Sequence, residues 1–245
     1  MQVSGSIYGS NPAKADPSVS GSGVFLGEIF VTRVAAFIDG FNLYHAIARL
    51  HEPHLKWLDL WKLMERQIRP KSESLTAVYY FSAYAEWLPG PFARHQEYVR
   101  ALKAVGVTPI MGHFKGKDRH CHKCGANWIA HEEKETDVNV ALQMLNEAYK
   151  GAYDKALLVT RDSDLKPAIE MVRHNFAANN VTVVAPPHLG HSNDLIQVAS
   201  AKQKIKKTQI AESLLPQYVM SGDPETVVAT RPAEYDPPAP VAPKY

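Results

Sequence analysis

Three aspartates stand just behind two apolar runs of this 245-residue chain, and together they could hold a metal ion. Asp39 follows the run Arg33–Ile38, and Asp162 and Asp164 follow the run Lys155–Thr160. Ligands of open parallel sheets bind at the carboxyl ends of the strands, so two such strands would deliver acidic groups to one edge. Carboxylates gathered there repel one another, and a divalent cation removes that repulsion.

A fourth aspartate, Asp137, lies in the first turn of a helix predicted over 136–149. Acids at helix starts are common caps, and Asp162 or Ser163 could in the same way cap a helix that starts at Leu165. Each acid alone is typical of a cap, but the four together favour a cation site. Mg²⁺ and Mn²⁺ prefer oxygen ligands, and one or two such ions activate water for attack on a phosphodiester.

Alternating strands and helices are predicted to position these acids. Five apolar runs are predicted as strands: 33–38, 75–82, 107–111, 155–160 and 181–185. Apolar residues recur at helical spacing in 41–50, 57–69, 91–105, 136–149 and 165–176, and one or two further helices are expected within 192–214. This alternation predicts an α/β fold, in which a central, mainly parallel sheet of about five strands is covered on both faces.

Composition divides the chain into a body of ordinary globular type and two tails. Hydrophobic residues make up 45% and charged residues 21%, so a sizeable core is expected. Residues 1–24 are rich in Ser, Gly and Ala and are predicted as a disordered leader. The Pro-rich segment 221–245 is predicted as a disordered tail, which leaves a body of 25–220. The net charge of +2 is too small to indicate a nucleic-acid partner by itself.

The cysteines and the hydropathy pattern bear on the compartment. The three-residue step from Cys121 to Cys124 is too short for an ordinary structural disulfide, and the chain has no other cysteine. A reducing, cytoplasmic compartment is therefore expected. No apolar run approaches the roughly 20 residues that span a bilayer, so no membrane partner is expected.

Three strings carry a resemblance to a known family: FIDGFNLYHA at 37–46, EEKETDVNVALQML at 132–145 and LLVTRDSDLKPAI at 157–169. Their order and spacing resemble the three signatures of the NYN domain, a branch of the PIN-like nucleases, over roughly 33–215. The subgroup resembled is the bacterial, standalone kind that carries a Cys-x-x-Cys segment. The resemblance implies a three-layer α/β/α PIN-like fold and cleavage of RNA that depends on Mg²⁺ or Mn²⁺.

The resemblance also implies roles for single residues. The predicted catalytic group consists of the residues that match the family's acids and their polar partner: Asp39, Asn42, Asp137, Asp162 and Asp164. The four aspartates are the predicted ligands of Mg²⁺ or Mn²⁺, and Asn42 is expected to position the scissile phosphate. Contacts with the RNA substrate are predicted for Arg161, Ser163 and Lys134. PIN-like domains often pair, so a homodimer is a further expectation.

Two other functions are compatible with these acids. The domain could be a catalytically weak regulatory module that binds RNA or protein, in which case the acids serve as caps or hold metal weakly. It could also be a phosphotransfer enzyme of another type. A phosphatase of the HAD type needs Asp-x-Asp directly after its first strand, where this chain has Asp39-Gly40-Phe41, and a Toprim nuclease needs a lone Glu there.

The segment 113–134 combines both cysteines with four histidines. A Cys-x-x-Cys pair followed by glycine resembles a zinc knuckle, and a ligand set of Cys121, Cys124, His113 and His131 is available for zinc. The second Cys pair of a usual zinc site is missing, so a surface hairpin with an incidental thiol pair is the alternative. A redox pair is disfavoured because no helix start follows to lower a thiol pKa.

A basic run lies near the end of the body, at Lys202, Lys204, Lys206 and Lys207. It is assigned here to a C-terminal helix. Such a run can follow a phosphate backbone, but it is more typical of a solvated helix face.

Overall fold

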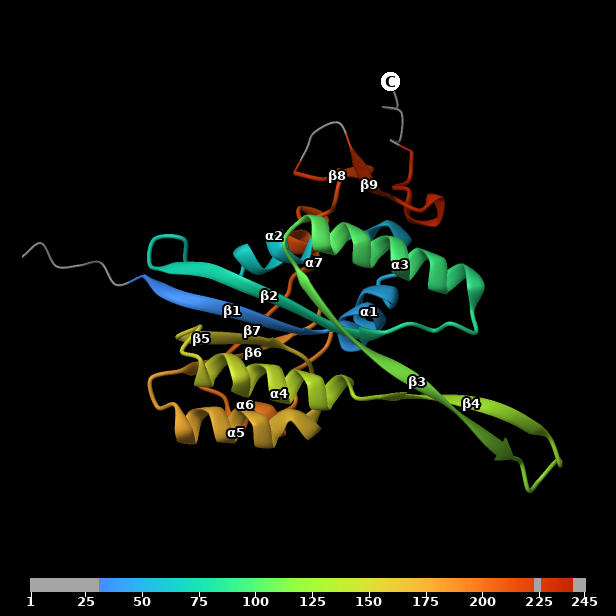
Figure 1. Ribbon diagram of the computed structural model, residues 1–245, viewed down its shortest axis with the longest axis horizontal. Coiled ribbons are helices and arrows are strands. Elements are labelled where there is room, and N and C mark those ends of the chain that lie inside the picture. The colour runs from blue at the N-terminus through green and yellow to red at the C-terminus, as the bar shows by residue number, and fades with distance from the viewer. Residues whose placement is uncertain (1–30, 223–225, 240–245) are drawn as a thin grey trace, which may run out of the picture.

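The computed structural model describes residues 31–222 and 226–239, and its main body is a three-layer α/β/α arrangement (Figure 1). The central sheet has the order β4-β3-β2-β1-β5-β6-β7; β4 is antiparallel to β3 and every other neighbouring pair is parallel. Its strands are β1 (Thr32–Asp39), β2 (Glu73–Ala83), β3 (Thr108–His120), β4 (Asn127–Lys134), β5 (Lys155–Val159), β6 (Asn180–Ala185) and β7 (Ala201–Lys204). The predicted fold class is confirmed.

Helices cover both faces of the sheet. One face carries α1 (Gly40–Ala48), α2 (Leu60–Glu65), α3 (Pro89–Ala104) and α7 (Lys207–Ala211), and the other carries α4 (Thr136–Tyr149), α5 (Lys166–Asn175) and α6 (Asn193–Val198) (Figure 1). The short 3-10 helices η1 (Pro53–Lys56) and η2 (Ser163–Leu165) lead towards α2 and α5. The strand connections through helices are the reason that most of the sheet is parallel.

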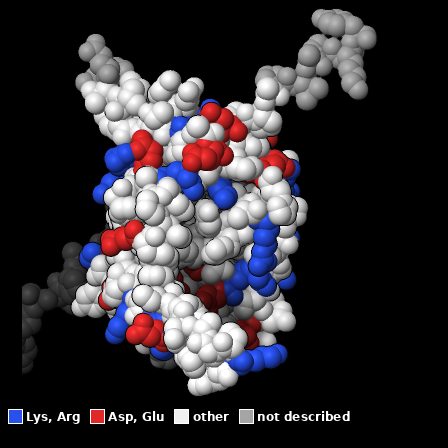
Figure 2. All heavy atoms as spheres, turned by 90° about the vertical axis from the view of Figure 1, so that its right-hand side faces the viewer, with Lys and Arg blue, Asp and Glu red and all other residues white. Residues whose placement is uncertain are grey.

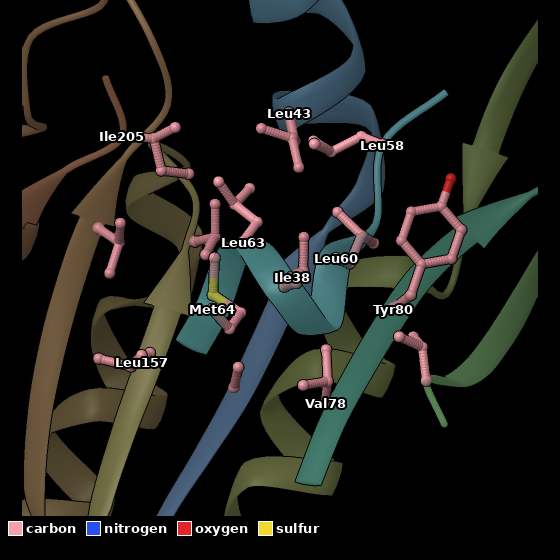
Figure 3. Packing of buried hydrophobic residues seen from close by; sticks show 14 of the residues in the cluster. Ile38, Leu43, Leu58, Leu60, Leu63, Met64, Val78, Tyr80, Leu157 and Ile205 are labelled. Atoms are coloured by element: carbon pink, nitrogen blue, oxygen red, sulfur yellow. The ribbon is translucent and has the colours of Figure 1, made fainter. Parts of the chain in front are cut away.

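The core is divided in two by β1, whose residues from Val34 to Asp39 are all buried. Ile38 packs with Leu63 and Val78 in the layer under α1 and α2, as Figure 3 shows. Phe37 points to the opposite layer, which α4 and α5 cover. Burying each of these large side chains contributes roughly 1.5–3 kcal/mol, so the end of β1 is a rigid place to mount a functional group.

The sheet has seven strands where about five were predicted. The missed strand β4 lies inside the cysteine segment, and β7 lies inside the region predicted as helical. The sequence of β7, AKQK, has no apolar pattern, and its strand conformation comes from pairing with β6 at the sheet edge. Lysines are common on such edge strands. The assignment of Lys202 and Lys204 to a helix was therefore wrong.

The predicted disordered tail is also wrong for residues 226–239. Strand β8 (Tyr218–Met220) pairs antiparallel with β9 (Val227–Thr230), and the 3-10 helix η3 (Ala233–Tyr235) follows. Apolar side chains on these two strands pack in a separate cluster with Trp57. The proline content had masked the short apolar run of β9. The predicted leader 1–24 lies outside the described residues.

No helix within residues 31–222 and 226–239 is long and apolar enough to cross a membrane.

Candidate active site at the ends of β1 and β5

The two central strands of the sheet end side by side at a point where the strand order reverses. From β1 the chain passes to β2 and β3 on one side, and from β5 it passes to β6 and β7 on the other. The following helices α1 and α5 leave towards opposite faces, which opens a crevice at the strand ends. Figure 2 shows acidic side chains inside a hollow on this side of the molecule, with basic side chains next to them.

Asp39 is the most deeply placed acid, with only 3% of its surface exposed. Its carboxylate caps α1 by accepting a hydrogen bond from the backbone amide of Asn42 at 3.0 Å. It also accepts one from the hydroxyl of Thr160 at 2.9 Å. Burial raises the pKa of Asp39 and the charge of Asp162 adds to that rise, while these hydrogen bonds oppose it.

Gly40 explains how α1 can begin directly at the buried end of β1. A Cβ atom at this position would lie 2.6 Å from the carbonyl oxygen of Phe81 and 2.6 Å from the ring of Tyr80. Any larger residue would therefore push α1 away from β2 and displace Asp39. The Asp39-Gly40 pair is thus a local requirement of the site geometry.

Asn42 holds the β1 and β5 ends together. Its side-chain amide donates to Asp39 at 2.5 Å, and its carbonyl oxygen accepts from the backbone amide of Arg161 at 3.3 Å. Both ends of this side chain are therefore occupied within the protein. The structure shows that Asn42 positions Asp39 and the end of β5, and its role towards a phosphate stays a prediction.

Asp162 and Asp164 follow β5 as predicted. The Asp162 carboxylate accepts from the backbone amide of Asp164 at 3.0 Å and so caps η2. The backbone amide of Asp162 donates to the Thr160 hydroxyl at 3.0 Å, which continues the network to Asp39. The capping alternative is therefore real for Asp39 and Asp162. Thr160, fully buried, was missed by the sequence reasoning although it stands directly at the strand end.

Asp137 is not a cap. The N-cap of α4 is Glu135, a left-handed residue with φ of 77° and no capping side-chain bond. Burial raises the pKa of Asp137 to about 6, and the charges of Asp162, Asp39 and Asp164 contribute in that order. The four predicted aspartates therefore lie close enough to act on one another electrostatically.

Glu133, at the end of β4, is a fifth acid that the sequence reasoning did not single out. Burial, Asp137 and Asp39 raise its pKa to about 7. The backbone amide of Thr136 donates to this carboxylate, but Oε1 is buried with no hydrogen-bond partner among the described residues. The alternation of β4 could have revealed it, since Glu132 and Lys134 share one face and Glu133 must face the other.

Gly112 allows β4 to deliver Glu133 to the site. A Cβ atom there would lie 2.5 Å from the carbonyl oxygen of Lys134. The chain between β4 and α4 can therefore pass directly over β3, which brings Glu133 and Asp137 to the same crevice as Asp39.

The donor set suits a hard divalent cation. Five carboxylates, one with an unsatisfied buried oxygen and three with raised pKa values, form a negative region. Within the described part of the chain, no three His, Cys, Asp or Glu side chains are already gathered as a metal site. The like charges repel one another, and two of the acids face backbone amides as caps.

Three predicted substrate contacts lie in different settings. Ser163 and Arg161 are exposed at the crevice beside Asp162. Lys134 is not brought to the acids, because its Nζ lies 3.3 Å from Glu132 and strand alternation turns it away from Glu133.

A basic pocket of about 250 Å³ borders the acidic crevice. Asn42, His45, Arg49 and Arg161 contribute to its lining. The Nε atom of Arg161 donates to the carbonyl oxygen of Gly190 at 2.7 Å, which fixes the guanidinium. Neither arginine forms a salt bridge among the residues that the structure describes, so both charges are available to an anion.

An aromatic pocket of about 330 Å³ lies on the other side of Phe41 and His45, which line both pockets. Its walls include Tyr44, Tyr80, His95, Tyr98 and Tyr235. His95 faces the Tyr80 hydroxyl at 3.1 Å, and burial lowers the pKa of His95 to about 4, so the imidazole is neutral. At the rim, Nζ of Lys56 lies 4.7 Å from the centre of the Tyr44 ring.

The predicted zinc ligands are not brought together. Cys121 and Cys124 lie at the turn between β3 and β4, whereas His113 and His131 lie further back on those strands. His113 faces Glu135 at 3.3 Å, and His131 stacks on Trp87 with ring centres 3.6 Å apart. Eight residues of extended chain separate His113 from Cys121, or roughly 26 Å. The Cys₂His₂ set predicted from the sequence is therefore wrong in both histidines.

The three-layer fold and the strand-end acids define an α/β domain of the PIN-like type. The chain belongs to the NYN domain family, whose model matches residues 33–205, and this family is part of the PIN-like nuclease superfamily. The resemblance of the three sequence strings is thereby confirmed.

The chain is similar to one protein in sequence and to one solved structure in fold. The chain is 28% identical over 232 residues to 6-hydroxy-3-succinoylpyridine 3-monooxygenase HspA of Pseudomonas putida (strain DSM 28022 / S16), covering 78% of this chain and 73% of that protein. A solved structure of a protein of unknown function from Vibrio parahaemolyticus aligns with a TM-score of 0.52 and 18% identity, over 76% of this chain and 97% of that one. The second similarity concerns the fold alone.

Proposed function

We propose that this protein is a metal-dependent ribonuclease that hydrolyses phosphodiester bonds in RNA at the acidic crevice. The observation that carries the proposal is the uncompensated cluster of carboxylates at the reversal point of the sheet. Burial first, and then the charges of neighbouring acids, raise the pKa values of Asp137 and Glu133. Proteins seldom keep such a group unless it has a ligand or a reaction to serve.

Mg²⁺ or Mn²⁺ would be held by Asp39, Asp137, Asp162 and Asp164, with Glu133 beside them. Bound there, the ion would lower the pKa of a water and neutralise charge on the phosphate.

Other residues of the protein orient these carboxylates and handle protons next to them. Thr160 and Asn42 hold the Asp39 carboxylate in one orientation through hydrogen bonds of 2.9 and 2.5 Å. Glu133, with a pKa of about 7, can accept or release a proton near neutral pH, which a general base or acid requires. We therefore assign it the proton acceptor's role beside the crevice.

The basic pocket would bind the RNA backbone. Arg49 and Arg161 form no salt bridge within the part of the chain that the structure describes, and they lie next to acids that would otherwise repel a polyanion. A strand whose phosphate rests there would pass over Asn42 towards the carboxylates. These contacts position the substrate without reading its sequence.

Cleavage of a labelled single-stranded RNA tests the proposal. Wild type, Asp39→Asn and Asp162→Asn would be compared with Mn²⁺, with Mg²⁺ and with chelator, and Asp118→Asn on the exposed hairpin is the matched control. We expect metal-dependent cleavage in wild type and control and its loss in both site variants. RNA binding without cleavage by the folded, metal-supplied protein would replace this proposal with the regulatory binding module.

A second candidate is the oxygenation of a small pyridine acid. The relative from Pseudomonas putida is named for that reaction, and the aromatic pocket beside the crevice suits a planar ring. Lys56 lies at its rim with no salt bridge among the described residues, so it could meet a carboxylate on the ring's side chain. Such a reaction consumes O₂ and two electrons from an external reductant.

One comparison separates the two candidates. Oxygen consumption would be measured with 6-hydroxy-3-succinoylpyridine and a reduced nicotinamide, in wild type, Lys56→Met and Asp162→Asn. Turnover that is lost in Lys56→Met would favour the oxygenase. No oxygen consumption, together with RNA cleavage that survives Lys56→Met, would favour the nuclease.

A further inference from the structure

The β3–β4 hairpin extends from the body as an arm, here defined as residues 113–134 (Figure 1). Strand β2 pairs with β3 only as far as Gly112, so 113–120 and 127–134 pair only with each other. An isolated two-stranded hairpin is marginally stable in water. Trp87 stacks on His131 and contacts Phe114, which fastens the root of the arm, but these contacts do not reach its tip.

The tip of the arm is a turn built around Cys121 and Cys124. The amide of Gly125 donates to the carbonyl oxygen of Cys121 at 2.8 Å, and the amide of Cys121 donates to Ala126 at 2.9 Å. Gly125 has a φ of 72°, which closes the turn. The backbone amides of Cys124 and Lys123 and the thiol of Cys124 donate to the Cys121 sulfur.

The two sulfur atoms are therefore in hydrogen-bonding range of each other on one exposed turn, which the bond from Gly125 to Cys121 closes. Two thiolates on a tetrahedral zinc ion stand about 3.8 Å apart, given Zn–S bonds of about 2.3 Å. Such a turn is thus close to the arrangement that one half of a Cys₄ zinc site requires.

The same chain does not supply the other half. Both cysteines and all eleven histidines lie in the described residues, and no three His, Cys, Asp or Glu among these form a metal site. His120 is held by Asn127 through Nδ1 at 2.8 Å. A structural zinc ion nevertheless takes four ligands.

We infer that the arm tip is half of a zinc site, which two copies of this chain complete by placing Cys121 and Cys124 of each around one Zn²⁺ ion. Four thiols bind the ion and release four protons, so no oxidant or reductant is needed. The two knuckles are related by a twofold axis through the metal, which is the commonest symmetry of homodimers. This inference does not rest on the ribonuclease proposal.

Charge and exposure at the tip agree with this arrangement. Lys117 and Arg119 both pair with Glu132, and Lys123 and Asp118 carry opposite charges, so two tips can approach without a large net charge. A zinc ion with four thiolates carries a charge of −2, which Lys123 of each copy would partly neutralise. Trp128 is 51% exposed and Ile129 is 60% exposed on opposite faces of β4, so a second arm would find apolar surface to cover.

Zinc content and molar mass of the full-length chain test the inference. The protein would be stripped of metal under a phosphine reductant, titrated with Zn²⁺, and measured by elemental analysis and light scattering after gel filtration. We expect half a zinc ion per chain and a zinc-dependent mass twice the 27.2 kDa of one chain. Co²⁺ should give the strong thiolate charge-transfer absorption of a four-sulfur site.

Variants locate the ligands. Cys124→Ser and the double variant with Cys121→Ser should lose the metal and the zinc-dependent dimer, whereas His122→Asn and His120→Ala should keep both. Circular dichroism would verify that each variant is folded. One zinc ion per monomer, lost in the histidine variants, would overturn the inference, and so would reduced protein that binds no zinc.

Discussion

The carboxylates of the crevice come from two regions that are held very differently. Those at the ends of β1 and β5 sit in a hydrogen-bond network, in which Asp39 caps α1 and Asp162 caps η2. Those at the β4–α4 junction, Glu133 and Asp137, have pKa values of about 7 and about 6 with few hydrogen bonds to oppose the rise, and one oxygen of Glu133 has no partner among the described residues. Hydrogen bonds within the fold stabilise the carboxylates of the first region, whereas those of the second have fewer such partners and are left to bind a ligand.

The difference shows that one carboxylate can both cap a helix and belong to the candidate site. Asp39 stabilises α1 and at the same time faces the crevice, so its replacement should cost both stability and activity. Asp137 makes no capping hydrogen bond and other acids repel its charge, so its replacement should cost activity with little loss of stability.

Replacing Asp137 by Asn should lower RNA cleavage by roughly a thousandfold or more, since several kcal/mol of metal-mediated charge stabilisation are lost. The same change removes a repelled charge, so the thermal midpoint at pH 7.5 should stay the same or rise. Single-turnover cleavage and differential scanning fluorimetry measure the two effects. Glu132→Gln, one strand position from Glu133 on the opposite face, is the control that should keep full activity.

Replacing Asp39 by Ala should destabilise the protein by about 1–2 kcal/mol, because a helix cap is lost and the Thr160 hydroxyl loses its acceptor. Urea unfolding at pH 7 measures this change. Asp164→Ala, an exposed acid of the same crevice, should change stability much less. Equal losses in both variants would remove the contrast between a capping and a free carboxylate.

Glu133 and Asp137 should make stability fall as pH rises. Their folded pKa values are about 7 and about 6, above the ordinary values of 4.5 and 3.8. The folded protein therefore keeps protons that the unfolded chain has released, so this contribution is complete below about pH 4 and lost by about pH 7. Glu133→Gln should flatten the profile, and Mn²⁺ should stabilise wild type at pH 7.5 but not at pH 4.5. A profile unchanged by Glu133→Gln would contradict the assignment.

Arg49→Gln should have the smallest effect, a weaker binding of RNA with little change in single-turnover rate at saturation. Losing one phosphate contact should reduce the slope of log affinity against log salt by about one. Fluorescence anisotropy with a labelled RNA and the Asp162→Asn protein measures binding without cleavage. Arg100→Gln, whose side chain pairs with Glu97 on α3, serves as the matched control.

Much of the site could be predicted because strand ends and acids are both local signals. Asp39, Asp162 and Asp164 follow apolar runs directly, and a parallel sheet brings such ends together. Glu133 was missed because its role depends on β4, a strand that pairs only with its hairpin partner and has little apolar pattern. Thr160 was missed because a hydroxyl in a buried network resembles any other polar residue at a strand end.

The prediction that His113 and His131 bind zinc failed for a different reason. His113 and His131 lie within twenty residues of the cysteines in sequence, yet the register of β3 with β4 carries them to the root of the arm. A Cys/His count contains no information on how far an extended hairpin separates its ends. Sequence spacing predicts a metal site only when the intervening chain folds back.

Strand β4 begins just after the cysteine turn and ends at Lys134, next to Glu133, so one extended segment joins the tip of the arm to the crevice. The ring of Trp87 stacks on His131 and holds β4 against the body between these two ends. When the tip is free, thermal bending of the arm moves the Glu133 carboxylate at its other end. When a second copy binds the tip, the range of positions of Glu133 would become smaller. Binding at the arm tip would thus restrict the motion of Glu133 in the crevice, and slower amide hydrogen exchange at the β4–α4 junction would measure the change.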